Sequence, residues 1–149
     1  MGHRAKSQGE SLLLKENILP IQQSGQLQMI GNRMSSSSLD TSAFAPYMQV
    51  RFADGHTDAM MLPQLRYKGR TIVYMADLLP SLGHLPLPYV MAYDTRPLIT
   101  MTEKESFLQE ALDNDYILFF EHDPVNECCT LRQTERGIRV NEIFKLSDL

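Results

Sequence analysis

From Tyr47 onwards, turn residues divide the sequence into short apolar runs, and this pattern restricts the chain to a fold built around a sheet. Lys68-Gly69 and Arg136-Gly137 each lie between two strand-like runs, where a tight turn would make a hairpin. We expect strands in residues 47–52, 59–67, 70–75, 116–120, 129–134 and 138–144.

One helix is expected within this series of strands. Thr102-Glu103-Lys104-Glu105 matches the capping box that opens helices. The apolar positions that follow predict a buried helix face made of Phe107, Leu108, Ala111 and Leu112. Residues 79–100 contain too many prolines for a regular element, so we expect a structured loop or a broken helix there. Strands mixed with a helix in this way predict a layered α/β (α+β) domain.

The periodicity of these elements also predicts the core. In residues 47–52 apolar side chains alternate with Tyr47, Gln49 and Arg51, which is typical of a strand buried on one face only. Taking the apolar face of every element, the predicted core consists of Met48, Val50, Phe52, Met60, Leu62, Ile72, Tyr74, Phe107, Leu108, Leu112, Ile117, Phe119 and Leu131.

The first 46 residues have a different character. Residues 7–25 predict a helix that ends at Gly25, with a break or a new first turn near Pro20. The segment from Gly31 to Pro46 is serine-rich and predicts a surface loop or flexible connection. We therefore divide the chain into an N-terminal helix with a flexible connection, residues 1–46, and a layered domain, residues 47–149.

Composition excludes several classes of protein. Lys and Arg total 14 against 18 Asp and Glu, and a net charge of −4 argues against a nucleic-acid partner. No apolar run approaches the roughly 18 residues that cross a bilayer, and the start of the chain lacks the apolar core of a signal peptide. The adjacent Cys128 and Cys129 give no disulfide framework. We therefore expect a cytoplasmic protein with no membrane partner.

Three predicted strands are followed directly by polar side chains that could bind a metal ion. His56 follows the first strand, Asp77 the third, and His122 the fourth. Strand ends can bring side chains from distant sequence positions together, and imidazole with carboxylate suits zinc or a similar metal. The spacing matches no compact zinc-finger pattern, so on the residues alone a metal site and solvated turn residues both remain open.

A resemblance to a known family favours the metal site. Asp54-Gly55-His56-Thr57, Met75-Ala76-Asp77 and Phe120-Glu121-His122-Asp123 resemble the third, fourth and fifth metal-binding motifs of the metallo-β-lactamase superfamily. The resemblance covers the C-terminal half of that family's αββα sandwich, which is therefore the expected fold. It implies a site of two zinc ions, with His56 on the first, His122 on the second and Asp77, the catalytic carboxylate, bridging both. In the family, a hydroxide held by the metals attacks the bond to be cleaved.

The resemblance also suggests supporting residues. Asp54, Asp58 and Asp123 are candidates to orient the ligand imidazoles, although exposed turn carboxylates are an equal alternative. The proline-rich stretch after Asp77 is expected to line the pocket. Its candidate substrate contacts are His84, Tyr89, Tyr93 and Arg96, for which packing or surface roles remain open.

One departure from the family pattern limits the expected activity. The first metal motifs of the family, His-x-His-x-Asp-His, have no counterpart in this sequence. We therefore expect part of a hydrolase that binds zinc weakly and is inactive alone. Its expected partners are a small-molecule substrate and either the missing half or a second copy of the chain.

Two functions of different class remain open at this point. The first is a metal-dependent hydrolase acting on an ester, amide, thioester or phosphodiester. The alternative is a non-catalytic binding or oligomerisation module. Metal content after dialysis would separate them.

Overall fold

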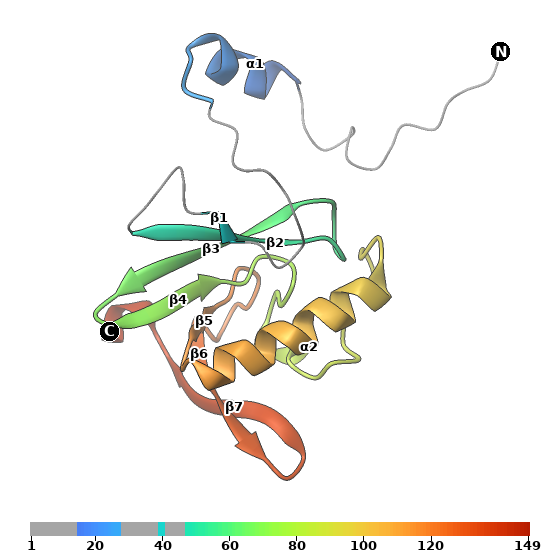
Figure 1. Ribbon diagram of the computed structural model, residues 1–149, viewed down its shortest axis with the longest axis vertical. Helices are drawn as coiled ribbons and strands as arrows, with labels where there is room; N and C mark the ends of the chain where they lie inside the picture. Colours follow the sequence, from blue (N-terminus) through green and yellow to red (C-terminus); the bar gives the residue numbers. More distant parts are fainter. Residues whose placement is uncertain (1–14, 28–38, 41–46) are drawn as a thin grey trace, which may run out of the picture. The chain divides into compact units, whose positions relative to one another are not determined.

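The computed structural model describes residues 15–27, 39–40 and 47–149, and divides the chain into two compact units, residues 1–31 and 32–149 (Figure 1). The first contains α1 (Lys15–Gln23). The second contains β1 (Leu39–Asp40), β2 (Met48–Ala53), β3 (Met60–Tyr67), β4 (Arg70–Tyr74), the short 3₁₀ helix η2 (Leu82–His84), α2 (Pro97–Asp113), β5 (Ile117–Phe119), β6 (Cys128–Thr134), β7 (Gly137–Phe144) and the 3₁₀ helix η3 (Leu146–Asp148).

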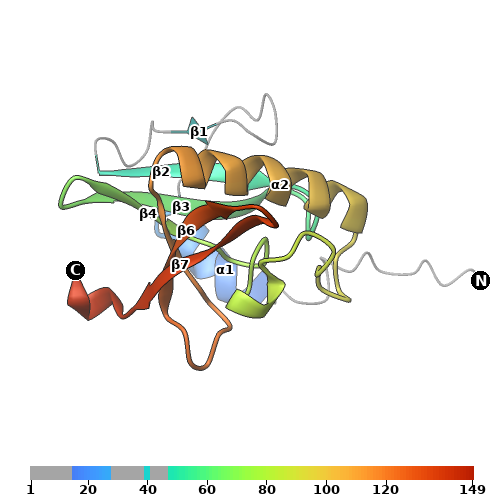
Figure 2. The ribbon, with the colours of Figure 1, turned by 90° about the horizontal axis from the view of Figure 1, so that it is seen from below.

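The strands form one sheet in which spatial order follows sequence order, from β1 to β7. Every neighbouring pair is antiparallel except β4 and β5, which run parallel. A parallel pair needs a crossover connection, and α2 lies in that connection. Figures 1 and 2 show α2 lying across one face of the sheet. The expected layered α/β class is therefore observed.

The two predicted hairpins are confirmed. At the turn between β3 and β4, Lys68 has φ of 48° and Gly69 has φ of 80°. Two successive residues with positive φ are typical of the type I′ turn, whose twist matches that of the strands it joins. Gly137, where β7 begins, has φ of 87°, a conformation that glycine adopts without strain.

The predicted start of the long helix is wrong. α2 begins at Pro97, with Arg96 as the residue before it, and so includes the end of the predicted proline-rich loop. Proline is favoured in the first turn because its missing N–H would have no partner there. Thr102 lies inside the helix, where its hydroxyl donates to the carbonyl of Leu98 at 3.1 Å instead of capping the N-terminus.

The predicted core is largely confirmed. Its fully buried members are Val50, Phe52, Leu62, Ile72, Phe107, Leu108, Ile117 and Leu131. The half-buried ones are Met48, Met60, Tyr74, Leu112 and Phe119. The main cluster lies between the sheet and α2, and it also contains residues from the segment after β4 that periodicity did not identify: Met75, Leu78, Leu79 and Leu85. That segment is irregular, and its burial therefore leaves no periodic signal.

The expected one-sided burial of β2 is wrong at Arg51. This side chain is only 8% exposed, and its guanidinium forms an ion pair with Glu110 of α2 at 2.5 Å. Arg51 also lies over the ring of Phe107. The helix therefore covers the face of β2 that the sequence pattern assigns to solvent.

The N-terminal predictions are tested only in part. α1 is continuous through Pro20, so the predicted break there is wrong. The bond that Pro20 cannot make is with the carbonyl of Glu16, which lies in the solvent-exposed first turn. Gly25 has φ of 73° and follows the helix end, as predicted. Residues 7–14 and most of the serine-rich connection lie outside the described residues.

Two absences concern the described residues alone. None of the helices there is long and apolar enough to span a bilayer. Cys128 and Cys129, on β6, are both free and buried. Burial raises the pKa of the two thiols to about 11 and about 12, respectively, which is unfavourable for a reactive thiolate.

Candidate metal centre

The direction of the strands brings the three predicted ligands to one edge of the sheet. β2 and β4 are both antiparallel to β3, so they run in the same direction, and β5 is parallel to β4. The carboxyl ends of these three strands therefore meet at one edge. His56 follows β2, Asp77 follows β4 and His122 follows β5. Sheet direction and the position of each residue after its strand are enough to make them converge.

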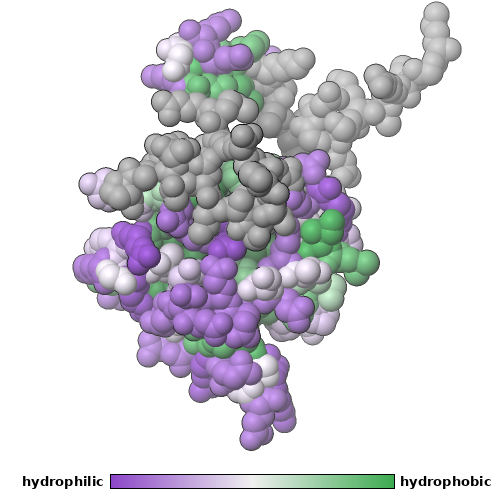
Figure 3. Space-filling model, viewed as in Figure 1, coloured by the Kyte–Doolittle hydropathy of each residue, from purple (hydrophilic) through white to green (hydrophobic). Residues whose placement is uncertain are grey.

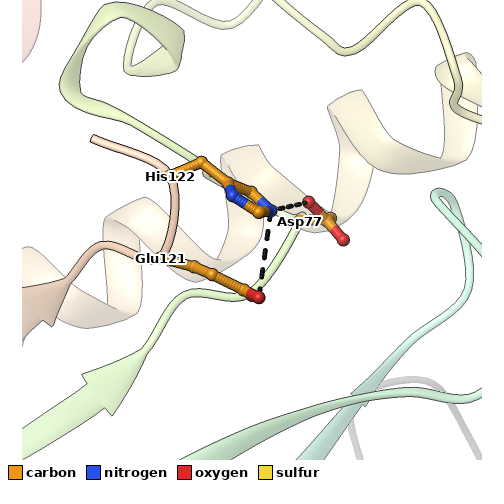
Figure 4. Close-up of side chains that lie close together, drawn as sticks. All are labelled: Asp77, Glu121 and His122. Atoms are coloured by element: carbon orange, nitrogen blue, oxygen red, sulfur yellow. Dashed lines mark ion pairs between the residues drawn. The ribbon is translucent and has the colours of Figure 1, made fainter. Parts of the chain in front are cut away.

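Asp77 lies between the two imidazoles. Its Oδ2 is 3.3 Å from Nε2 of His56, and its Oδ1 is 3.3 Å from Nε2 of His122. Figure 4 shows the second of these contacts. Each carboxylate oxygen thus faces a different histidine, which is one arrangement in which a carboxylate can bridge two cations.

The donor atoms fit a divalent metal ion. With bonds of about 2.0–2.2 Å, two ligands of a tetrahedral zinc ion lie about 3.3–3.6 Å apart. Both Asp77–histidine separations are in this range. In addition, Asp77 Oδ1 is buried and has no hydrogen-bond partner among the described residues, although His122 Nε2 is close. A buried carboxylate oxygen without a partner is costly, and a cation would satisfy it.

Asp94 orients His56, and the sequence did not identify it. Its side chain is completely buried, and Oδ1 lies 2.9 Å from Nδ1 of His56. When Nδ1 carries the proton and donates it to Asp94, Nε2 keeps its lone pair directed towards Asp77. The available signal was the position of Asp94 in the loop expected to line the pocket.

The loop that carries His56 is fastened to the first turns of α2. The carboxylate of Glu103 accepts hydrogen bonds from the backbone N–H of Asp54 at 2.8 Å and of Gly55 at 3.0 Å. A Cβ at Gly55 would lie 2.2 Å from the backbone nitrogen of Thr100. Only glycine allows this close approach of loop and helix. The position of His56 therefore depends on α2.

The predicted orienting carboxylates are engaged in fastening loops. Asp54 Oδ1 accepts from the N–H of Ala59 at 2.8 Å, and Asp58 forms an ion pair with Arg96. Asp123 accepts hydrogen bonds from the backbone N–H groups of Leu82, Val125 and Asn126. Burial by itself raises the pKa of Asp123, but these hydrogen bonds outweigh it and lower the pKa to about 2.

The candidate substrate contacts lie in different environments. Tyr89 and Tyr93 are 59% and 78% exposed. His84 is half-buried, and its Nδ1 lies 2.8 Å from the hydroxyl of Ser81. The Arg96 guanidinium donates to the carbonyl of Asp54 in addition to its ion pair with Asp58. Arg96 is thus part of the loop anchor, whereas the tyrosines are accessible.

The first turn of α2 adds an apolar surface near this loop anchor. Leu98 and Ile99 are 77% and 39% exposed there. Figure 3 shows a hydrophobic patch where α2 begins. It follows Arg96, which is joined to the loop that carries His56, so the patch borders that loop.

Lys104 holds residues 84–89 in place, and the sequence did not identify this role either. It is only 1% exposed, and its ammonium donates to the carbonyls of His84 at 2.9 Å, Pro86 at 3.0 Å and Tyr89 at 2.8 Å. Burial lowers its pKa to about 8, while the nearby carboxylate of Asp94 acts in the opposite direction. Lys104 lies outside the buried face predicted for this helix, so nothing in the sequence indicated a buried cation.

A separate groove of about 860 Å³ does not contain this site. It is lined by α2, residues 85–88 and the turn between β6 and β7, including Leu108, Arg136 and Ile138. None of the three predicted ligands lines it, so the volume of the groove gives no information about the metal centre.

Comparisons with solved structures identify the fold. The chain is similar to a probable metal-dependent hydrolase from Staphylococcus aureus, with 22% identity and a TM-score of 0.61, over 71% of this chain and 38% of that one. It is also similar to AidC, a dizinc quorum-quenching lactonase, with 19% identity and a TM-score of 0.64, over 87% of this chain and 42% of the other. AbOPH, a hydrolase in the beta-lactamase superfamily, has 17% identity and a TM-score of 0.65, over 87% of this chain and 43% of its own.

Sequence comparison adds nothing further, because no family model and no curated protein matches the chain. At identities this low, the structural likeness establishes the fold and not the activity. The chain spans 38% to 43% of the three similar structures. The described chain therefore has the fold of metal-dependent hydrolases of the beta-lactamase superfamily, over less than half of their length.

Proposed function

We propose that this chain supplies one side of the two-metal centre of a hydrolase. His56 and Asp77 would bind one divalent cation, and Asp77 and His122 the other, with zinc as the expected metal. The observation that carries the proposal is Asp77 itself, because each of its oxygens faces one imidazole at 3.3 Å. A carboxylate placed between two histidines in this way can hold two cations at a fixed separation.

The chemistry follows from the donor set. When bound, the cations would activate water and polarise the bond to be cleaved. The residues of the chain would hold the cations and orient the ligand side chains. Asp94 fixes the ring of His56, and Glu103 fixes the loop on which His56 lies. Lys104 holds the segment that carries the candidate substrate contacts His84 and Tyr89.

The substrate proposed is a small molecule with an ester, amide, thioester or phosphodiester bond. All four reactions need a polarised oxygen and an activated water, which is what a two-metal centre supplies. The exposed Tyr89 and Tyr93, together with the apolar first turn of α2, offer a surface for an apolar substituent. The neighbour AidC is described as a lactonase, and a lactone is a cyclic ester.

The count of ligands requires a partner. Each cation would have only two ligands from His56, Asp77 and His122, whereas a catalytic zinc normally has three and a water. We propose that the missing half of the sandwich, or a second copy of the chain, supplies the rest. The sheet face opposite α2 is suited to such a partner, because it exposes apolar side chains of β3: Met61, Leu65 and Tyr67.

Complementation tests the proposal. The chain would be assayed alone and joined to a segment carrying His-x-His-x-Asp-His, against lactone, thioester and phosphodiester substrates in the presence of Zn²⁺. We expect turnover only for the joined protein. Asp77→Ala should abolish it most completely because Asp77 touches both cations, and His56→Ala and His122→Ala should also abolish it.

Asp113→Ala is the matched control, because this carboxylate is exposed at the end of α2 and should leave activity unchanged. Metal-dependent turnover by the chain alone, lost in Asp77→Ala, would show that the ligand count is wrong. Full activity of the joined Asp77→Ala protein would show that the site is elsewhere.

A further inference from the structure

Glu121 lies beside the candidate ligands and has no role in the site proposed so far. It follows β5, immediately before His122, and its Oε1 is 3.8 Å from His122 Nε2. Figure 4 shows the side chains of Asp77, Glu121 and His122 pointing towards one another. One ligand atom from each of these residues lies within 4.8 Å of the other two.

The three donor atoms lie close together, and one of them has no hydrogen-bond partner among the described residues. The oxygen of Asp77 that faces His122 is the buried one without a hydrogen-bond partner among the described residues. Two carboxylates beside one imidazole repel each other in the absence of a cation, and a divalent cation between them removes that repulsion. A cation at this place would therefore be stabilised by all three donors.

Glu121 is also held in place from the sheet. The Tyr74 hydroxyl, at the end of β4, is hydrogen-bonded to the Glu121 carboxylate. A carboxylate with such a partner has fewer orientations than a free surface glutamate.

We propose that Glu121 is a third protein ligand for the cation bound by Asp77 and His122, so that this chain binds one divalent transition-metal ion without a partner. The proposal rests on the proposed function in taking Asp77 and His122 as ligands. It goes further in making one of the two cation sites complete within the chain. Two carboxylate oxygens and one imidazole nitrogen suit Zn²⁺ or Mn²⁺, and three ligands leave a position open for water.

Metal binding by the purified full chain tests this inference. Titration calorimetry with Zn²⁺ measures affinity and stoichiometry, and the visible absorption of bound Co²⁺ reports the ligand set. Glu121→Gln removes the charge, and Glu121→Asp keeps the charge but withdraws the carboxylate by one methylene. Glu135→Gln removes the same charge from the exposed turn between β6 and β7, and serves as control.

We expect one cation per wild-type chain. Both Glu121 variants should bind at least about tenfold more weakly with an altered Co²⁺ spectrum, while Glu135→Gln should bind like wild type. Wild-type affinity and spectrum in Glu121→Gln would overturn the inference. So would a charge effect alone, in which Glu121→Asp behaves like wild type, or the absence of any binding by the wild-type chain.

The proposed function fails by a different result. If Asp77→Ala and His122→Ala bind the cation as tightly as wild type, the ions lie elsewhere and both proposals are wrong. If only the Glu121 variants are unaffected, while Asp77→Ala and His122→Ala lose binding, the proposed function stands and the third ligand is not Glu121.

Discussion

Lys104 lies in the middle of α2 and is nevertheless among the most deeply buried side chains described. Burying an ammonium group is unfavourable unless its hydrogen bonds are replaced. Here the carbonyls of His84, Pro86 and Tyr89 replace them, and these carbonyls belong to the segment between β4 and α2. The ammonium of Lys104 and the carbonyls of residues 84–89 therefore satisfy each other's hydrogen-bonding requirements.

Lys104→Met tests this mutual dependence. The variant keeps the length and apolar stem of the side chain but leaves three carbonyls without their donor. We expect a loss of about 1–3 kcal/mol in the free energy of unfolding, measured by urea denaturation, and faster hydrogen exchange in residues 84–93. Lys145→Met, at an exposed position, should leave stability unchanged. Equal stability of Lys104→Met and wild type would contradict the role given to Lys104.

Comparison of wild type with Lys104→Met should also reveal a pH dependence of the free energy of unfolding. Burial lowers the pKa of Lys104 from 10.5 to about 8, so above pH 8 the unfolded chain binds more protons than the folded one. Stability from this group therefore rises with pH. The raised pKa values of Cys128 and Cys129 act in the opposite direction above pH 9. Between pH 8 and 9, the free energy of unfolding of wild type minus that of Lys104→Met should increase; a flat difference would be contrary evidence.

For individual residues, the sequence draws attention to those that follow strands, but it does not reveal those whose role depends on contacts with distant parts of the chain. His56, Asp77 and His122 each lie within four residues of the end of an apolar run, and the family resemblance, rather than the run itself, singled them out as candidate ligands. Asp94 acts on a histidine that is 38 positions away in the sequence. Nothing in the local pattern around Asp94 or Lys104 distinguishes them from solvated residues, because their roles are defined by tertiary contacts.

Among the elements, α2 determines where the loop carrying His56 can lie. Glu103 binds the loop backbone, and Gly55 allows the loop to approach the backbone of Thr100. The N-terminal turns of the helix and the sheet edge that holds the candidate ligands are thus connected through one tightly packed contact.

Gly55→Ala tests this contact. The added methyl group would lie 2.2 Å from the nitrogen of Thr100, so either the loop or the helix must move. We expect a loss of about 1–3 kcal/mol in stability from overpacking and a weaker binding of cation by His56 in the complemented protein. Gly83→Ala is the matched control, since the nearest atom to its added Cβ is Ser81 Oγ at 3.6 Å. Similar stability and metal affinity of the two variants would contradict the proposed contact.

Strands and hairpins were more predictable than the helix start. Strand runs have an internal period, and a hairpin needs a specific pair of turn residues such as Lys68-Gly69. The start of α2 was predicted five residues too late, because Thr102 and Glu105 matched a capping box that the fold does not use. Proline at the first helical position competes with that signal, and the contact of Arg96 with the Gly55 carbonyl at 2.8 Å favours the earlier start.

In the second unit as a whole, the sheet separates two unequal surfaces. The face towards α2 holds the main core, whereas the opposite face holds a smaller cluster around Ile72, Ile117 and Cys128. On β3 that second face exposes Met61, Leu65 and Tyr67, between the buried Leu62 and Gln64. Exposed apolar side chains in a row favour association with another surface.

Assembly in solution follows from this surface. We expect the chain to form a dimer or a larger species, measured by light scattering coupled to size exclusion. Met61→Lys should shift the population towards monomer by placing a charge on the face. Leu98→Lys, which changes an exposed leucine of α2, should not. A well-folded wild-type monomer at high concentration would contradict the expectation.

The layered class and the superfamily likeness could be anticipated from the sequence, because three motifs lie in register at strand ends. The unequal faces could not, since the burial of Arg51 and the exposure of Leu65 both depend on which face α2 covers. A one-dimensional pattern reports that a strand has two faces, but the choice between them is made by the packing of another element.

The order of the strands has a consequence for how rapidly the site can be formed. Each strand pairs with its neighbour in sequence, and the longest connection between paired strands among the described elements is the one through α2. Folds dominated by local pairings have low contact order and fold quickly, because little chain entropy is lost before each pairing is made. His56 and Asp77 lie within the locally paired part, whereas Asp77 and His122 follow the two strands that the α2 connection joins, so their approach also requires the pairing of β4 with β5. The three candidate ligands, His56, Asp77 and His122, are therefore expected to come together during the folding of the chain itself, before any slower encounter with a partner or a metal ion.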